Sequence, residues 1–296
     1  MKTKLIRIAE ISKERPKEVF TSIYHLINKE LLLQCHKELD GKKATGLDGV
    51  TKAEYNENLT ENINDLLNRL KTKTYYPTPA KRVYIPKANG KVRGLAIAIY
   101  EDKIVQLATT KLIQSIFENK LADSLYGFRP NRSCHRAVSQ LMKIVQNRSI
   151  KYIVDADIKG YFDNIDHNWL IECIKQHIKD PNVLNLINRF LKAGILEKGE
   201  IEKTIKGTPQ GSILSPVLAN IYMHYVLALW FEKIVKRKCI GECHLIVYAD
   251  DYVCCFEYYE EAELFYKQIL PKRLNKFRFT IRTKQNKTNT IWKIYT

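Results

Sequence analysis

Three aspartates carry the clearest chemical signal in the sequence. Asp250 and Asp251 stand side by side between two apolar runs, and Asp157 ends a third apolar run. Neighbouring carboxylates repel each other, and burying them is costly unless a cation or hydrogen-bond donors compensate. If the runs are adjacent strands, the three side chains converge. Carboxylate oxygens with room for water and phosphates suit Mg²⁺ better than Zn²⁺, and two such ions would serve phosphoryl transfer. An Asp-Asp turn considered alone is more often simply solvated.

Local sequence patterns predict the elements that would position these aspartates. Residues 151–157 are predicted to form a strand, and 245–256 a strand, a two-carboxylate turn and a second strand. Asn89-Gly90 is a strong tight-turn signal, so 82–97 is predicted to be a β-hairpin. Helical spacing of apolar residues predicts helices over about 16–39, 59–70, 101–117, 134–148, 167–192 with a break at Pro181, and 213–237. Because helices and strands are interleaved without regular βαβ alternation, the predicted class is α+β.

The composition indicates a globular protein with a polyanionic partner. Among 296 residues there are 49 Lys plus Arg against 32 Asp plus Glu, a net charge of +17, and 45% are hydrophobic. This balance excludes collagen-like and disordered chains and favours nucleic acid over an anionic membrane as the partner. The most apolar helical stretch, 219–231, is too short to span a membrane and carries Asn220 and His224.

The cysteines and the amino terminus bear on the compartment. Seven cysteines are scattered through apolar segments, an odd set that does not fit a disulfide framework. The first residues are basic but are not followed by the apolar core of a signal peptide. We therefore expect most of the cysteines to be buried, reduced thiols, and the protein to be cytoplasmic.

Six ordered motifs resemble those of one enzyme family. Three segments resemble the polymerase motifs of reverse transcriptases. They are Asp157-Ile-Lys-Gly-Tyr-Phe-Asp-Asn-Ile-Asp-His167, Gly207-Thr-Pro-Gln-Gly-Ser-Ile-Leu-Ser-Pro216 with Leu218-Ala-Asn220, and Tyr248-Ala-Asp-Asp251. Upstream, the fingers segments of the same family are similar to Gly46-Leu-Asp-Gly-Val50, Ile85-Pro-Lys-x-x-Gly-Lys-x-Arg93 and Tyr126-Gly-Phe-Arg-Pro-x-Arg-Ser133. The amino-acid sequences of these motifs most resemble those of bacterial group II intron-encoded reverse transcriptases of the maturase family.

The resemblance implies a right-hand polymerase fold with fingers and palm, in which an antiparallel palm sheet packs on helices. Fingers would occupy 1–150, including the 82–97 hairpin, and palm 151–296, with a fingers insertion expected at 181–206. The family's primer-gripping strand is not recognisable after residue 281, so we expect the chain to stop before the thumb.

The resemblance also implies an RNA-directed DNA polymerase that transfers a nucleotide from dNTP to a primer 3′-hydroxyl on an RNA template. Binding of group II intron RNA would support splicing and retrohoming. Asp157, Asp250 and Asp251 would be catalytic and, with the Ile158 carbonyl, would hold two Mg²⁺ ions, for which Mn²⁺ could substitute.

Four residues would contact the incoming nucleotide. Phe162 would lie under the sugar and exclude a 2′-hydroxyl; the alternative is packing in the palm core. Lys87 and Arg93, on the two arms of the predicted hairpin, would reach the triphosphate, where a guanidinium can bind phosphate bidentately; the alternative is solvated charge. Gln210 would meet the nucleotide sugar or the template; the alternative is a polar group of the turn, where Gly211 permits close approach.

Five basic residues are predicted to contact the template backbone by charge and counterion release. They are Lys81, Arg82, Lys91, Arg129 and Arg132. Each could instead be inert.

One departure and two alternatives remain. The family usually has Arg-Pro-Leu-Gly-Ile-Pro where this chain has Arg93-Gly-Leu-Ala-Ile-Ala98. A non-catalytic RNA-binding module derived from such an enzyme is one alternative. A retron or defence-associated reverse transcriptase is the other, although the Gly46–Val50 loop favours the intron lineage.

Overall fold

The computed structural model describes residues 2–86, 90, 92–281 and 291–294. The chain forms two compact units, each built from two separate segments. Unit 1 comprises Met1–Lys120 and Ile174–Val217, and unit 2 comprises Leu121–Cys173 and Leu218–Thr296. The segment 181–206, predicted to be a fingers insertion, lies within unit 1, and the assignment of residues to fingers and palm stays a prediction.

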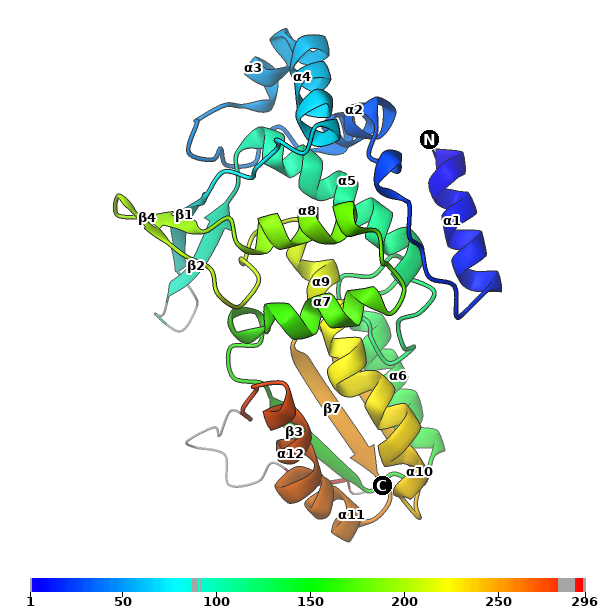
Figure 1. The fold of residues 1–296 in the computed structure, drawn as a ribbon. Helices are drawn as coiled ribbons and strands as arrows, with labels where there is room; N and C mark the ends of the chain where they lie inside the picture. The colour runs from blue at the N-terminus through cyan, green and yellow to red at the C-terminus, as the bar shows by residue number, and fades with distance from the viewer. Residues whose placement is uncertain (1, 87–89, 91, 282–290, 295–296) are drawn as a thin grey trace. The chain divides into compact units, whose positions relative to one another are not determined.

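Unit 1 combines a helical part with a small sheet (Figure 1). The buried helix α5 contacts α1 and α2, and the Ser12 hydroxyl donates a hydrogen bond to the Ile116 carbonyl. The sheet has the order β2-β1-β4-β5, with only the β1/β4 pair parallel. β1 and β2 confirm the predicted hairpin. The elements are α1 (Lys2–Glu14), η1 (Tyr24–Leu26), α2 (Lys29–Glu38), α3 (Lys52–Glu57), α4 (Leu59–Lys71), β1 (Ala80–Pro86), β2 (Val92–Ile97), α5 (Tyr100–Phe117), α8 (Pro181–Leu191), β4 (Ile195–Glu197) and β5 (Glu200–Glu202).

The predicted helix over 16–39 is wrong in its first half, where long-range hydrogen bonds replace helical ones. Phe20 exchanges two backbone hydrogen bonds with His177 and Lys179, both 2.8 Å long. The Asp180 carboxylate accepts from the backbone N–H of Ile23 and Tyr24, at 2.6 and 2.8 Å. Backbone groups satisfied in this way are not available to a helix, so α2 begins only after Asn28, whose side chain caps it.

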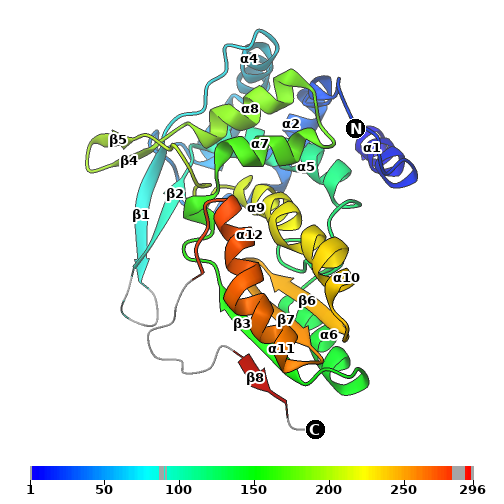
Figure 2. The ribbon, with the colours of Figure 1, turned by 60° about the horizontal axis from the view of Figure 1, so that its bottom comes forward.

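Unit 2 is built around an antiparallel sheet with the order β6-β7-β3-β8 (Figure 2). α6 covers one face, where Ala137 and Ile144 join Ile246 and Cys255 in an apolar cluster. On the other face, Phe256 packs against Phe231 and Phe265. The elements are α6 (Cys134–Asn147), β3 (Tyr152–Asp157), η2 (Phe162–Asn164), β6 (Cys243–Tyr248), β7 (Asp251–Phe256), α11 (Tyr259–Leu264), η5 (Phe265–Ile269), α12 (Leu270–Lys276) and β8 (Ile291–Lys293).

Two helices belong partly to each unit. They are α7 (His167–Lys175) and α9 (Ser215–Met223). From α9 the chain continues without a break through the π-helical turns η3 (His224–Ala228) and η4 (Phe231–Val235) into α10 (Lys236–Lys238). This confirms the long helix predicted over 213–237.

The burial of most cysteines agrees with the sequence-based expectation, although Cys134 is exposed. All seven cysteines are free thiols, and Cys35, Cys173, Cys243, Cys254 and Cys255 are buried. Within the described residues, no helix has both the length and the apolar character needed to cross a membrane.

Candidate active site

The predicted adjacency of the aspartate-bearing strands is confirmed (Figure 2). β3 pairs antiparallel with β7, and Asp157 stands directly opposite Asp251. Side chains of directly opposed residues leave the same face of a sheet, with their Cβ atoms about 4.5–5.5 Å apart. Tyr248 pairs with Asp251 across the β6–β7 hairpin, so the connecting turn is Ala249-Asp250. The fold thus brings two carboxylates together and places the third in the adjoining turn.

The turn that carries Asp250 is supported by the segment 124–127. The backbone N–H of Tyr126 donates to the Val247 carbonyl, and that of Val247 donates to the Ser124 carbonyl, both at 2.8 Å. A Cβ atom on Gly127 would lie only 2.3 Å from the backbone nitrogen of Ala249. Glycine is therefore required at position 127, because any side chain would displace the turn.

Two polar residues of the long helix hold this supporting segment. The Asn220 amide donates to the Gly127 carbonyl at 2.7 Å, and His224 Nδ1 accepts from the backbone N–H of Ala122 at 3.1 Å. Both side chains are buried. In the sequence both residues were evidence against a membrane helix, and Asn220 also ended one of the family motifs. Their spacing of four residues on an otherwise apolar helix was the signal that they share one face and meet one partner.

Arg129 and Arg132 also brace this loop. Arg129 is 8% exposed, and its Nη1 donates to the carbonyls of Ala122 and Leu125 at 2.8 and 3.0 Å. Arg132 Nη2 binds the Asp123 carboxylate at 2.7 Å, and its guanidinium lies over the Tyr126 ring. The burial of Arg129 does not support its predicted contact with nucleic acid, because its guanidinium is engaged by the protein backbone.

Two neighbouring aromatic residues follow Asp157, and they differ in burial: Tyr161 lies in the core, whereas Phe162 is partly exposed. Tyr161 is 1% exposed and its hydroxyl donates to the Ala219 carbonyl at 2.7 Å. Burial raises the pKa of Tyr161 well above its usual value. Phe162 is only half-buried, and its ring meets those of Tyr161 and Phe128 edge to face, with centroids 5.6 and 6.4 Å apart. Tyr161, rather than Phe162, fills the core position beside the sheet.

Ile158, the predicted carbonyl ligand, follows Asp157 directly. Its side chain is 1% exposed, and its backbone forms a β-bridge with Ile281. The neighbouring Lys159 N–H donates to the Thr280 carbonyl at 3.0 Å. These contacts fix the backbone immediately after Asp157.

The basic residues of β1 and β2 lie on different faces of their hairpin. Lys81 pairs with Ile97 and Arg93 with Ile85, which places both exposed cations on one face. Arg82 lies on the other face. Its Nε and Nη2 lie 3.4 and 3.6 Å from the Glu197 and Glu202 carboxylates, so its predicted contact with nucleic acid is not supported. Lys87 and Lys91 lie outside the described residues.

The Gln210-Gly211 turn docks on strand β2. The Ala96 N–H donates to the Gln210 carbonyl at 2.7 Å. Gly211 has φ 106°, and a Cβ there would lie 2.9 Å from the Ala96 carbonyl oxygen. In the structure, the backbone that Gly211 approaches closely is that of strand β2 in the same unit. The Gln210 side chain is half-buried.

Divalent cations fit the donor atoms of the aspartate site. Asp157 and Asp251 offer carboxylate oxygens from one face of the sheet, and Mg²⁺ commonly binds one or two carboxylates while water and substrate phosphates complete its coordination. In the part of the chain that the structure describes, no three His, Cys, Asp or Glu side chains form a group arranged to hold a metal ion.

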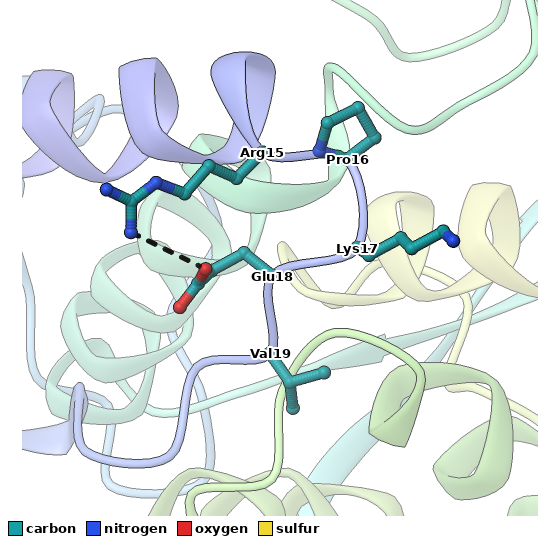
Figure 3. A pocket seen from close by; sticks show the side chains of 5 residues that line it. All are labelled: Arg15, Pro16, Lys17, Glu18 and Val19. Atoms are coloured by element: carbon teal, nitrogen blue, oxygen red, sulfur yellow. Dashed lines mark ion pairs between the residues drawn. The ribbon is translucent and has the colours of Figure 1, made fainter.

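A separate hollow of about 620 Å³ is lined by Arg15, Pro16, Lys17, Glu18 and Val19 of unit 1 (Figure 3). None of the predicted site residues lines it. Its ion pair, between Arg15 Nη1 and Glu18 Oε2, spans 3.9 Å between one exposed and one partly exposed side chain, and ion pairs in contact with solvent contribute little to stability.

Comparison with known families decides what this arrangement belongs to. Residues 85–293 match the family model described as "Reverse transcriptase (RNA-dependent DNA polymerase)". The chain belongs to the reverse transcriptase family. It is 41% identical to the group II intron-encoded protein LtrA of Lactococcus lactis subsp. cremoris over 222 residues, 74% of this chain and 37% of LtrA. It is 35% identical to the protein YkfC of Escherichia coli K12 over 67% of this chain and 53% of YkfC.

These relatives confirm the resemblance to group II intron-encoded reverse transcriptases. A more distant relative is the mitochondrial nuclear intron maturase 1 of Arabidopsis thaliana, 26% identical over 36% of this chain and 15% of that protein. The chain thus spans between about a third and half of the length of LtrA and YkfC.

Proposed function

We propose that this chain comprises fingers (unit 1) and palm (unit 2) of a group II intron-type RNA-directed DNA polymerase. The primer 3′-oxygen forms a bond to the α-phosphorus of a dNTP, the bond from that phosphorus to the bridging oxygen breaks, and pyrophosphate leaves. The proton of the 3′-hydroxyl passes to solvent. The observation that carries the proposal is the opposition of Asp157 and Asp251 beside the turn that holds Asp250.

Asp157, Asp250, Asp251 and the Ile158 carbonyl would hold two Mg²⁺ ions, with Mn²⁺ able to substitute. When bound, such ions activate the attacking hydroxyl and stabilise charge on the leaving pyrophosphate. The chain's own part is to position the reactants.

The remaining site residues are proposed to bind and select the nucleotide. The Phe162 ring lies under the sugar and excludes a 2′-hydroxyl, Gln210 contacts the sugar or the template, and Arg93 contacts the triphosphate. Lys87 is assigned to the triphosphate by the family resemblance alone.

The proposed partners are an RNA template with its primer, and group II intron RNA in particular. Lys81 and Arg93 form an exposed basic pair on one hairpin face, and the net charge of +17 favours RNA phosphates. The similarity to the group II intron-encoded protein LtrA suggests the intron as the RNA. Seven free cysteines, five of them buried, are consistent with a proposed cytoplasmic location, because thiols persist in reducing compartments.

Primer extension on an RNA template tests the proposal. This chain should add dNTP in the presence of Mg²⁺, and Asp250→Asn should lower the rate at least about hundredfold, since metal ions contribute several kcal/mol of transition-state stabilisation. Glu260→Gln, at an exposed carboxylate of α11, is the matched control and should leave extension unchanged. Equal rates for wild type and Asp250→Asn would contradict the proposal. RNA binding with no dNTP addition under any divalent ion would favour a non-catalytic RNA-binding module.

A further inference from the structure

Phe128 has a backbone conformation that is unfavourable for its residue type. Its φ is 55°, in the left-handed region that glycine and asparagine adopt far more readily than a bulky aromatic residue. Its side chain is nevertheless 50% exposed, so burial of the ring does not explain why a phenylalanine occupies a position with positive φ. A residue held in a sparsely populated conformation at the edge of a site points to a functional constraint.

Contacts on both sides of Phe128 impose this conformation. Gly127 is fixed by the Asn220 amide and by its close approach to Ala249. Arg129 is fixed through its guanidinium on the Leu125 carbonyl. The residues before and after Phe128 are therefore held in place by other parts of unit 2. This leaves the Phe128 backbone little freedom and places it next to the turn that carries Asp250.

The ring of Phe128 meets the ring of Phe162. The two planes make an angle of 83°, with centroids 6.4 Å apart, which is the edge-to-face arrangement that aromatic pairs favour. Phe162 also contacts Tyr161 edge to face, at 77° and 5.6 Å. Tyr161 is fixed in the core by its hydrogen bond to Ala219. Phe162 thus has an immobile neighbour in the core and a second neighbour, Phe128, on an anchored loop.

We propose that Phe128 is a positioning residue that holds the Phe162 ring in place and thereby determines how strongly the site rejects ribonucleotides. The inference rests on the proposed function, in which Phe162 lies under the nucleotide sugar. The Phe162 ring would act as a steric gate, because it excludes the 2′-hydroxyl by repulsion. It can do so only if the ring does not rotate away from the sugar. Because Phe162 is half-buried, the core restrains only part of its ring, and the contact with the Phe128 ring supplies a further restraint.

A nucleotide-binding experiment that needs no chemistry tests this role. The wild-type chain is bound to an RNA template with a primer ending in a dideoxynucleotide, and the complementary dNTP and the matching NTP are titrated in Mg²⁺. Wild type should prefer dNTP. Phe128→Asn, which tolerates the left-handed backbone, should reduce the ratio of the two affinities about three- to tenfold through tighter NTP binding, as expected from loss of one aromatic pair.

Three further variants separate positioning from a structural role. Phe128→Tyr keeps the ring and should keep the wild-type ratio. Phe128→Gly also suits a positive φ and should reproduce the effect of Phe128→Asn, with a melting temperature equal to or above that of wild type. Tyr258→Asn removes another exposed aromatic side chain, beyond the far end of β7, and should leave the ratio unchanged.

The outcomes distinguish failure of the positioning role of Phe128 from failure of the proposed polymerase function. An unchanged dNTP/NTP ratio in folded Phe128→Asn and Phe128→Gly overturns the positioning role and leaves the proposed function intact. Equal weakening of dNTP, NTP and primer-template binding would also overturn it, because the ring would then contact nucleic acid directly. A wild-type chain that shows no Mg²⁺-dependent dNTP binding would contradict the proposed function itself.

Discussion

Asp157 and Asp251 stand directly opposite each other on neighbouring antiparallel strands, so the sheet places two like charges on one face. Opposed like charges destabilise a sheet. An arrangement that lowers the stability of the protein without metal is typical of a binding site, because the bound cation removes the repulsion.

Replacing one carboxylate of this pair should separate stability from activity. We expect Asp157→Asn to raise the free energy of unfolding in metal-free buffer by about 0.2–1 kcal/mol. Primer extension should fall at least about hundredfold. Chemical denaturation and primer extension measure the two effects. The matched control is Asp155→Asn, on the same strand face but opposite Val253, which should show no such gain in stability. A loss of stability in Asp157→Asn would argue that no repulsion exists.

Shortening the proposed gate should relax sugar selection. Phe162→Val removes a steric obstacle, so NTP incorporation should rise while dNTP addition continues. Because Phe162 is half-buried, the loss of stability should be below the ~3–5 kcal/mol typical of a truncated core phenylalanine. Tyr161→Leu, in the core, should instead lower stability strongly and reduce both activities together. The measurements are kcat/KM for dNTP and NTP and the melting temperature. An unchanged selectivity in active Phe162→Val would remove Phe162 from the site.

Exposed and paired cations of the same strand should differ in their contribution to RNA binding. The logarithm of the affinity should fall linearly with the logarithm of salt concentration. Lys81→Gln should reduce the slope by about 0.7–0.9 if Lys81 contacts one phosphate. Arg82→Gln is the control, because Arg82 already lies between Glu197 and Glu202 and should leave the slope unchanged. Filter binding measures both slopes. A smaller slope for Arg82→Gln and an unchanged slope for Lys81→Gln would show that the RNA-binding face of the hairpin is assigned wrongly.

Removing the buried guanidinium of Arg129 should act on stability rather than on RNA binding. Arg129→Gln loses charge-assisted hydrogen bonds to the Ala122 and Leu125 carbonyls, and we expect a loss of about 1.5–3 kcal/mol. Arg237→Gln, at an exposed position, should change stability by less than about 0.5 kcal/mol. Urea denaturation gives both values. A stable Arg129→Gln variant with a reduced salt slope would restore the original expectation of a phosphate contact.

Asp102 should make the stability of unit 1 depend on pH. It is 1% exposed, and burial raises its pKa from 3.8 to about 7, although Tyr75 and the Thr78 N–H donate to it at 2.5 and 2.9 Å. A raised pKa means that the folded state holds the proton more tightly. The stabilisation is therefore complete below pH 3.8 and is lost as the pH rises towards about 7.

Between pH 5 and 7 the slope should approach but not exceed about 1.4 kcal/mol per pH unit. Asp102→Asn should remove this contribution, whereas Asp65→Asn, at an exposed carboxylate of α4, should not. Denaturation midpoints measured across this range give the slopes. Identical slopes for wild type and Asp102→Asn would contradict the raised pKa.

Several elements were predictable from the sequence because their signals are local. The apolar runs of 245–256 and 151–157 predicted β6, β7 and β3, and the Asn89-Gly90 signal predicted the antiparallel pairing of β1 with β2. The family resemblance, confirmed by the match over 85–293, rests on the order of short motifs along the chain. Neither source indicated what the individual basic side chains would contact.

What the sequence alone determined is the α+β class and the reverse transcriptase family, and it also supplied the prediction that three aspartates form the site. Only the tertiary structure decided that Arg129 is buried and that Arg82 is paired with carboxylates. It also decided that residues 20–24 bond to 177–180 instead of forming a helix. Helical and strand periodicity depend on neighbours a few residues away, whereas the partner of a guanidinium or a buried N–H group lies wherever the folded chain brings an acceptor.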